Sequence, residues 1–222
     1  MESETSGTRR YVSTRRAEAA GRTREAILAA ARALFVKQGY GATTVEQIAD
    51  AAGVSKPTVF AAAGNKRDLI KSLRDRAIAG DDEPIPLAQR EWFREALDEP
   101  DPRQSVRLHA RNVVRLHRNA GDLAEVLRTG AGADEELRKL WQTAERERRR
   151  DAAAFVDALL GRGALKAGLD RETAVDIVWI LTGADSFQRL VRIRRWSMAH
   201  YEEWLAETFL QQLLPPGSQS DP

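Results

Sequence analysis

The segment between Gly39 and Leu69 constrains the fold of this chain more than any other part of its 222 residues. It reads GYGATTVEQIADAAGVSKPTVFAAAGNKRDL. Two glycines open it, and two short stretches with helical apolar spacing follow, separated by Gly53. Glycine readily ends a helix in the left-handed conformation, so the segment predicts a short helix, a tight turn and a second short helix. This is the pattern of a helix-turn-helix unit.

Residues that favour helix starts stand at the expected places on either side of this turn. Thr44, followed by Gln47 three positions later, forms a capping box, in which each side chain accepts a hydrogen bond from the other residue's backbone. Ser55 is a favoured N-cap residue, and Pro57 is tolerated in a first helical turn because no backbone donor is needed there. The sequence therefore predicts that the motif spans about residues 44–63.

A longer helix precedes the motif. From Thr23 onward the apolar residues recur at helical intervals, which places them on one face of a helix. They are Ile27, Leu28, Ala31, Leu34 and Phe35. Asn65 can cap another helix after the motif. We therefore expect residues 21–81 to form one small helical domain.

Ahead of this domain, residues 1–20 carry no apolar periodicity, and we expect them to form a disordered basic arm. Arginines dominate the arm and the start of the next helix: Arg9, Arg10, Arg15, Arg16, Arg22 and Arg24. Clustered arginines attract phosphate by releasing counterions, without reading sequence. A solvated tail explains the same charges equally well, so both interpretations stay open.

The composition narrows the class of protein. The chain contains no cysteine, which excludes disulfides, cysteine-bound zinc and thiol nucleophiles. No window is long, apolar and uncharged enough to span a membrane, and the first residues lack the apolar core of a secretory signal. We expect a cytoplasmic protein that needs no cofactor.

The rest of the chain reads as helix. Between residues 82 and 214, Ala, Leu, Arg and Glu dominate, and strand-like alternation is absent. Residues 215–222 form a polar tail that we expect to be disordered. The predicted fold class is all-α, with a small N-terminal domain around the helix-turn-helix and a larger helical C-terminal domain.

The segment from about Arg22 to Ile70 resembles the TetR family of bacterial transcriptional regulators. The matching residues are Ile27–Ala31, Leu34, Phe35, Gly39, Tyr40, Ala42–Val45, Ile48, Ala49, Ala52–Ser55, Thr58–Phe60, Asn65, Lys66, Leu69 and Ile70. The resemblance implies an N-terminal domain that binds a double-stranded DNA operator. It also implies a helical C-terminal domain that dimerises and binds a small-molecule effector, and a dimer in turn implies a palindromic operator.

The resemblance also implies roles for individual residues. The candidate DNA-binding residues are Thr44, Ser55, Lys56, Pro57, Thr58, Phe60, Ala61, Lys66 and Arg22. Among them, the hydroxyl and amide of Thr44 would bind one phosphate, and Lys66 would bind another at the start of its helix. The residues from Ser55 to Thr58 would lie at the major groove.

The second motif helix departs from the family pattern. Family members usually carry tyrosine at the position of Phe60, followed by two larger polar or aromatic residues and then Phe, where this chain has Ala61–Ala63. The missing hydroxyl removes a phosphate bond worth about 1–2 kcal/mol. Alanines can touch thymine methyl groups but donate no hydrogen bonds to bases. We therefore expect specificity to rest on Lys56, Thr58, the basic arm in an adjacent minor groove and DNA shape.

Two apolar segments near the C-terminus predict a homodimer. The first is apolar on nearly every side: Val175, Ile177, Val178, Trp179, Ile180 and Leu181. The second presents an amphipathic stripe: Met198, Tyr201, Trp204, Leu205, Thr208, Phe209, Gln212 and Leu213. The resemblance implies that the last two long helices form a four-helix bundle, so we expect the interface at about 172–191 and 198–214. Closing a monomeric core is the alternative.

The effector pocket is predicted from aromatic or polar residues on otherwise apolar helix faces. These are His109, Asn112, Trp141, Phe155, Trp179 and Phe187. Taken singly, each fits core packing better than ligand contact. His109 and His117 lie on a shared face but lack a nearby acidic partner, so no metal site is expected.

An enzyme and a helical adaptor are the alternative functions. The chain has no phosphate-binding glycine loop, no serine elbow and no zinc-protease motif. Its carboxylates are scattered among arginines on helix surfaces, where ion pairing explains them. The alanine run at 61–63 slightly favours an adaptor that has lost DNA binding. A repressor is favoured over an activator, because a dimer on a promoter blocks polymerase without further contacts.

Overall fold

The structure is a computed structural model that describes residues 5–79 and 87–216. These ranges contain helices and no β-strand, which confirms the predicted all-α class. The expected domain boundary near residue 81 lies outside them, as do residues 1–4 of the arm and residues 217–222 of the tail.

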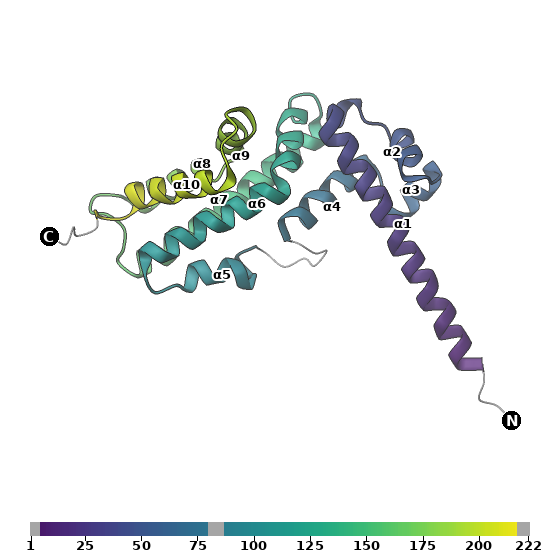
Figure 1. The fold of residues 1–222 in the computed structure, drawn as a ribbon, viewed down its shortest axis with the longest axis horizontal. Helices are drawn as coiled ribbons and strands as arrows, with labels where there is room; N and C mark the ends of the chain where they lie inside the picture. Colours follow the sequence, from purple (N-terminus) through teal and green to yellow (C-terminus); the bar gives the residue numbers. More distant parts are fainter. Residues whose placement is uncertain (1–4, 80–86, 217–222) are drawn as a thin grey trace.

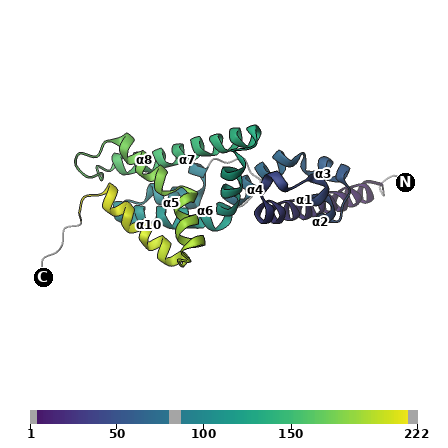
Figure 2. The same ribbon diagram turned by 90° about the horizontal axis from the view of Figure 1, so that it is seen from above.

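The helices differ widely in length and gather into two lobes. They are α1 (Thr5–Ala42), α2 (Val45–Ala52), α3 (Lys56–Ala63), α4 (Lys66–Ala79), α5 (Glu91–Asp98), α6 (Pro102–Gly130), α7 (Glu135–Gly161), α8 (Arg171–Leu181), α9 (Ala184–Phe187) and α10 (Met198–Leu213). A 3₁₀ turn, η1 (Leu87–Gln89), precedes α5, and a π-helix, η2 (Gln188–Ile193), follows α9. Figure 1 shows an N-terminal lobe of α1–α4 and a C-terminal lobe of α5–α10, and Figure 2 shows the same division from above.

One helix, α6, contributes to the hydrophobic cores of both lobes. Leu123, Val126 and Leu127, near its end, are buried among the apolar side chains of α1–α4. Val106 and Val113, nearer its start, belong to the core that α7, α8 and α10 complete. The two lobes are therefore joined through a buried helix and not only through a surface contact.

The helix α1 begins at Thr5, so the structure differs from the disordered arm predicted for residues 1–20. From Arg15 to Ala20 the residues are Arg, Ala and Glu, which favour the helical backbone without an apolar stripe. The residues from Thr5 to Thr14 are mostly Ser, Thr, Gly, Tyr and Val, and local propensity does not explain their helix. No proline interrupts the segment, and Gly21 is accommodated within the helix. Figure 1 shows the first turns of α1 projecting beyond the N-terminal lobe.

The helix expected across residues 172–191 is interrupted between α8 and α9. An interruption leaves carbonyl groups without helical partners, and buried carbonyls need donors from elsewhere. Arg148 of α7 donates to the carbonyl of Trp179, and His117 of α6 donates through Nε2 to the carbonyl of Thr182 at 3.2 Å. Local hydroxyl groups contribute as well, since Thr182 donates to the carbonyl of Trp179 at 3.2 Å and Ser186 donates to that of Leu181 at 3.3 Å. Distant and local donors therefore stabilise the break together.

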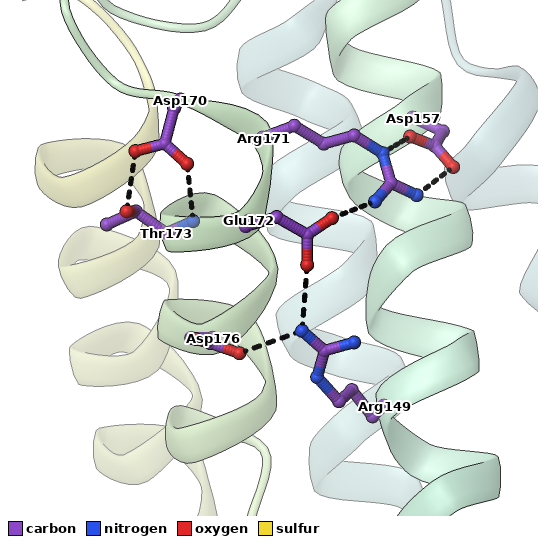
Figure 3. A network of polar contacts seen from close by, with 7 residues as sticks. All are labelled: Arg149, Asp157, Asp170, Arg171, Glu172, Thr173 and Asp176. Atoms are coloured by element: carbon purple, nitrogen blue, oxygen red, sulfur yellow. Dashed lines mark hydrogen bonds and ion pairs between the residues drawn. The ribbon is translucent and has the colours of Figure 1, made fainter.

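A polar network fastens the start of α8 to α7 (Figure 3). Arg171 of α8 donates two hydrogen bonds, of 2.6 and 2.8 Å, to Asp157 of α7. Arg149 of α7 reaches in the other direction, to Glu172 at 2.9 Å and Asp176 at 3.3 Å. Exposed pairs of this kind each contribute about 0–1 kcal/mol, so their main effect is to fix how the two helices align.

Two histidines are buried in the core of the C-terminal lobe. His109 stacks on Phe155 with ring centroids 3.8 Å apart, and neither ring nitrogen has a hydrogen-bond partner in the described ranges. Burial lowers the pKa of His109 to about 3. Burial also lowers the pKa of His117 to about 4, although its bond to the Thr182 carbonyl opposes the shift. Both rings are therefore neutral in the folded protein at neutral pH.

The turn after α2 gives a stability prediction with a matched control. Gly53 has φ 67°, and a Cβ there would meet no atom within 4 Å, so only backbone strain opposes a side chain. Replacing Gly53→Ala should lower the free energy of unfolding by about 1–2 kcal/mol. Replacing Gly21→Ala, within α1 and also free of neighbours, should raise it by up to about 1 kcal/mol. Urea denaturation measures both, and equal effects at the two positions would contradict the left-handed turn.

The buried His109 gives a pH prediction. Because its pKa is about 3 in the folded state and 6.5 when the ring is solvated, the unfolded chain takes up protons first as the pH falls. Its contribution to stability is full above pH 6.5 and is lost as the pH falls, by up to about 1.4 kcal/mol per pH unit. In His109→Leu this loss should be absent, so the unfolding free energy should fall less steeply between about pH 6.5 and 4 than in the wild type.

The control for that measurement is Phe93→Leu, which changes the same aromatic cluster without removing an ionisable group. It should keep the pH slope of the wild type even if it lowers stability at every pH. An unchanged slope in His109→Leu would show that His109 becomes protonated without loss of stability.

Candidate functional site

The helix-turn-helix motif is built as the sequence predicted. The hydroxyl of Thr44 accepts a hydrogen bond from the N–H of Gln47 at 3.2 Å, and Oε1 of Gln47 accepts one from the N–H of Thr44 at 2.9 Å. Gly53 is left-handed, and its N–H donates to carbonyls in the last turn of α2. The capping box and the glycine turn are both confirmed.

The helix α3 is anchored from behind and open in front. Val59 is fully buried in the core of the N-terminal lobe. Ser55 caps the helix, accepting a hydrogen bond from the N–H of Thr58 at 3.3 Å, and the two hydroxyl oxygens lie 2.7 Å apart. The outward side, here called the α3 face, consists of Ser55, Lys56, Pro57, Thr58, Phe60 and Ala61. All of these are exposed except Thr58, which is half-buried.

The cation of the α3 face is already paired within the chain. The ammonium of Lys56 bonds Glu46 of α2, and both side chains are about half exposed. The hydrogen bond from Lys56 holds the pKa of Glu46 below its usual value. The sequence does not predict Glu46 as the partner of Lys56, because two residues ten positions apart on different helices give no periodic signal. A phosphate would have to replace this carboxylate as the partner of Lys56.

Thr44 keeps only part of the donor set predicted for it. Its amide is engaged by Gln47 and its hydroxyl oxygen accepts from the same residue. A hydroxyl that accepts one hydrogen bond still has its own O–H to donate. This O–H also helps to hold the pKa of the neighbouring Glu46 low, so an anion that accepts it would replace that carboxylate and leave the capping box intact.

Lys66 has a different place from the one the resemblance implied. Its ammonium points back into the N-terminal lobe and donates to the carbonyls of Tyr40 at 2.7 Å and Thr43 at 2.8 Å. The same nitrogen lies 4.0 Å from the centre of the Tyr40 ring, and burial lowers the pKa of Lys66. In this structure Lys66 fastens α4 to the turn that follows α1, so a phosphate contact would require it to leave these partners.

The remaining two predicted residues lie at the surface. Phe60 is 46% exposed and carries no polar atom, so its ring is available for apolar contact only. Arg22 is exposed on α1 and forms no hydrogen bond or ion pair with other described residues. Both remain candidates for DNA contact on the basis of position alone.

The six residues predicted for an effector pocket do not form one site. Trp141 and Trp179 line a cleft of about 730 Å³ between α7, α8 and the α9–η2 segment. The other four are absent from its lining, and His109 and Phe155 are packed against each other in the core. Asn112 donates to the carbonyl of Trp92 at 3.0 Å, and Phe187 packs on His117. Two of the six predicted residues therefore line a cleft, and the other four are buried away from it.

Two further kinds of site are absent from the described ranges. No group of three or more metal-binding side chains there is close enough to hold an ion. No helix there combines the length and the apolar character needed to cross a membrane.

The comparisons with known proteins place the motif in a family. Residues 27–73 match the family described as "Bacterial regulatory proteins, tetR family". The chain is 30% identical over 159 residues to YdeS, an HTH-type transcriptional regulator of Bacillus subtilis. That alignment covers 71% of this chain and 74% of YdeS.

Solved structures extend the similarity to the whole fold. NalD of Pseudomonas aeruginosa, the secondary repressor of the MexAB-OprM multidrug efflux pump, aligns with a TM-score of 0.66 at 22% identity, covering 87% of this chain and 97% of NalD. SmeT of Stenotrophomonas maltophilia, in a complex with triclosan, aligns with a TM-score of 0.65 at 16% identity, covering 88% and 93%. At these identities the likeness concerns the fold, while the family follows from the match to residues 27–73 and from YdeS. The chain belongs to the TetR family of bacterial transcriptional regulators.

Proposed function

We propose that this regulator is a repressor that binds a palindromic operator as a homodimer and leaves it when a small molecule binds. The observation that carries the proposal is the α3 face. A short helix is anchored by the buried Val59 and presents Ser55, Lys56 and Thr58 outward. Such a helix fits the major groove of B-form DNA, which is about 12 Å wide.

The proposed DNA contacts use the donors that remain available on this surface. Lys56 exchanges Glu46 for a phosphate or a guanine edge, and Thr44 donates its O–H to a phosphate. Pro57, Phe60 and Ala61 supply apolar contact, including contact with thymine methyl groups. Hydroxyl groups at Ser55 and Thr58 sit at the start of α3, where the helix dipole favours an anion.

The proposed dimer uses the segments 172–191 and 198–214. Within one chain, Tyr201 and Phe209 of α10 are fully buried, so they stabilise the protomer and not the interface. Ile180 and Ile193 remain 65% and 74% exposed on the preceding segment. We assign the interface to the outer side of α8–η2 together with the outer side of α10. A two-fold dimer would place its two α3 faces roughly 34–36 Å apart, one turn of DNA.

Repression and release by an effector are proposed from the simplest mechanism and from the relatives. A dimer on a promoter blocks polymerase without any further contact. NalD is described as the secondary repressor of one multidrug efflux pump and SmeT as the repressor of another, and SmeT has been solved with triclosan. We place this activity in the cytoplasm, where the operator DNA lies.

The proposal is tested with DNA selected from a random pool by the full-length protein. Lys56→Gln should weaken binding to the selected site and reduce the slope of log K against log salt by about 0.9, the effect of one phosphate contact. Glu46→Gln should strengthen binding by up to about fivefold, because it removes the competing carboxylate. Fluorescence anisotropy across a salt series measures both effects.

The control is Lys71→Gln, which removes the same charge from α4, where Lys71 pairs with Asp75 at 2.9 Å. It should leave the salt slope unchanged. If the folded protein selects no sequence and binds no DNA at moderate salt, the repressor proposal fails and the adaptor function takes its place.

The arm gives a separate prediction. Residues 1–20 contain Arg9, Arg10, Arg15 and Arg16, and the described part of this segment extends α1 beyond the N-terminal lobe (Figure 1). Deleting residues 1–20 should weaken operator binding and lower the salt slope by more than about one unit, because each phosphate contact contributes about 0.9. Replacing the four arginines by glutamine should reproduce the loss. Unchanged affinity and slope in both variants would remove the arm from DNA binding.

A further inference from the structure

The turn that joins α1 to α2 leads directly into Thr44 and is held by side chains. The end of a helix leaves carbonyls without intrahelical partners, so other groups must supply the donors. The hydroxyl of the buried Thr43 donates to the carbonyl of Gly39 at 2.8 Å, and Gln38 donates to the carbonyl of Ala42 at 3.0 Å. The shape of the turn therefore depends on side-chain donors.

Lys66 supplies further donors, which reach this turn from α4. Its ammonium donates to the carbonyls of Tyr40 at 2.7 Å and Thr43 at 2.8 Å. The same nitrogen lies 4.0 Å from the centre of the Tyr40 ring. An ammonium has three N–H donors, and two carbonyls with one ring face account for all three. Lys66 therefore has no donor left for a phosphate.

The start of α4 offers little else to a phosphate. The side-chain oxygen of Asn65 accepts hydrogen bonds from the N–H groups of Arg67 at 2.9 Å and Asp68 at 3.1 Å. In return, the carboxylate of Asp68 accepts one from the N–H of Asn65 at 3.0 Å. These bonds occupy backbone amides of the kind that bind anions at a helix start, and the carboxylate adds a negative charge there. The local structure therefore opposes the phosphate contact that the resemblance implied for Lys66.

We propose that Lys66 is a positioning residue, which directs Thr44 at an operator phosphate and does not bind phosphate itself. The carbonyl of Thr43 and the N–H of Thr44 belong to one planar peptide unit, so a bond to the first fixes the orientation of the second. That N–H donates to Gln47 in the capping box. Lys66 therefore orients the capping box and, with it, the O–H of Thr44. This positioning role rests on the proposed function, which supplies the phosphate contact of Thr44.

The salt dependence of operator binding separates positioning from phosphate contact. Lys66→Gln should weaken binding to the selected operator about three- to tenfold, because the O–H of Thr44 is no longer directed at its phosphate. The slope of log K against log salt should stay unchanged, whereas Lys56→Gln should lower it by about 0.9 in the same assay. Lys71→Gln is the control and should change neither affinity nor slope. A slope lowered by about 0.9 in Lys66→Gln would make Lys66 a phosphate ligand and overturn the inference.

A double-mutant cycle separates positioning from general stabilisation of the N-terminal lobe. If Lys66 acts through Thr44, Lys66→Gln should cost no more than about twofold in affinity when it is added to Thr44→Val, which lacks the hydroxyl. Added to Thr44→Ser, which keeps the hydroxyl, it should cost the same factor as in the wild type. A lysine that only stabilised the lobe would cost the same factor in both backgrounds, and that result would overturn the inference.

Amide hydrogen exchange tests the same step without DNA. In Lys66→Gln the amides of Thr44 and Gln47 should exchange about three- to tenfold faster than in the wild type, because the capping box opens more often. The amide of Val59 in α3, which donates to the carbonyl of Ser55 at 3.1 Å, should keep its rate and so report that the lobe is folded. Unchanged rates at Thr44 and Gln47, or the same acceleration at Val59, would overturn the inference.

A second variant covers the case in which Lys66→Gln does not fold. Lys66→Met keeps an unbranched side chain that can pack on the Tyr40 ring but has no N–H to donate. The same losses in affinity and in amide protection are expected for it, again with an unchanged salt slope.

Failure of the positioning role and failure of the proposed function give different results. If the folded protein binds no operator, the proposed function fails and the phosphate contact of Thr44 fails with it. If the operator is bound but Lys66→Gln lowers the salt slope by about 0.9, the proposed function stands and only the positioning role is overturned.

Discussion

The structure depends most on the burial of α6 in two cores at once. Near its end, Leu123, Val126 and Leu127 complete the core of the N-terminal lobe, while Val106 and Val113 belong to the core of the other lobe. Removing the end of α6 would expose apolar surface of α1 and α4, so the N-terminal lobe is not complete without it. Because close-packed cores transmit strain, a displacement of α6 must also displace α1 and α4. In the proposed ligand response, α6 would be the physical link between the C-terminal lobe and the helix-turn-helix.

The parts that the sequence predicted well are those decided by neighbours three or four residues away. The capping box of Thr44 and Gln47, the left-handed Gly53 and the cap by Ser55 all involve backbone groups within one helical turn. Partners that are distant in sequence were not predicted. Lys66 bonds carbonyls more than twenty positions earlier, and Arg148 and His117 donate to carbonyls at the break after α8. At the start of α1 the structure is helical where the sequence predicted disorder, and helical propensity accounts for this only from Arg15 onward.

The effector pocket shows a different limit of sequence reasoning. An aromatic or histidine side chain on an apolar helix face has the same periodic signature whether it fills a core or lines a cleft. His109 and Phe155 stack in a filled core, whereas Trp179 stands at an open cleft, although all three had the same sequence pattern. The distinguishing feature is whether other helices cover the residue, and that depends on contacts distant in sequence. Arg146 and Arg189 also line the cleft, and no periodic pattern in the sequence marks either of them.

The ion pair between Lys56 and Glu46 explains how a sparse α3 face can still serve DNA binding. Both side chains are about half exposed, so the pair itself stabilises the free protein by only about 0–1 kcal/mol. Replacing the carboxylate by a phosphate of comparable charge keeps a charge-assisted hydrogen bond and also releases counterions from the DNA. The exchange therefore costs little free energy, and the counterion release strengthens DNA binding as the salt concentration falls. With Phe60 and Ala61 unable to donate hydrogen bonds, such backbone contacts would hold the helix in the groove, and sequence would be read mainly at the start of α3 and through the shape of the DNA.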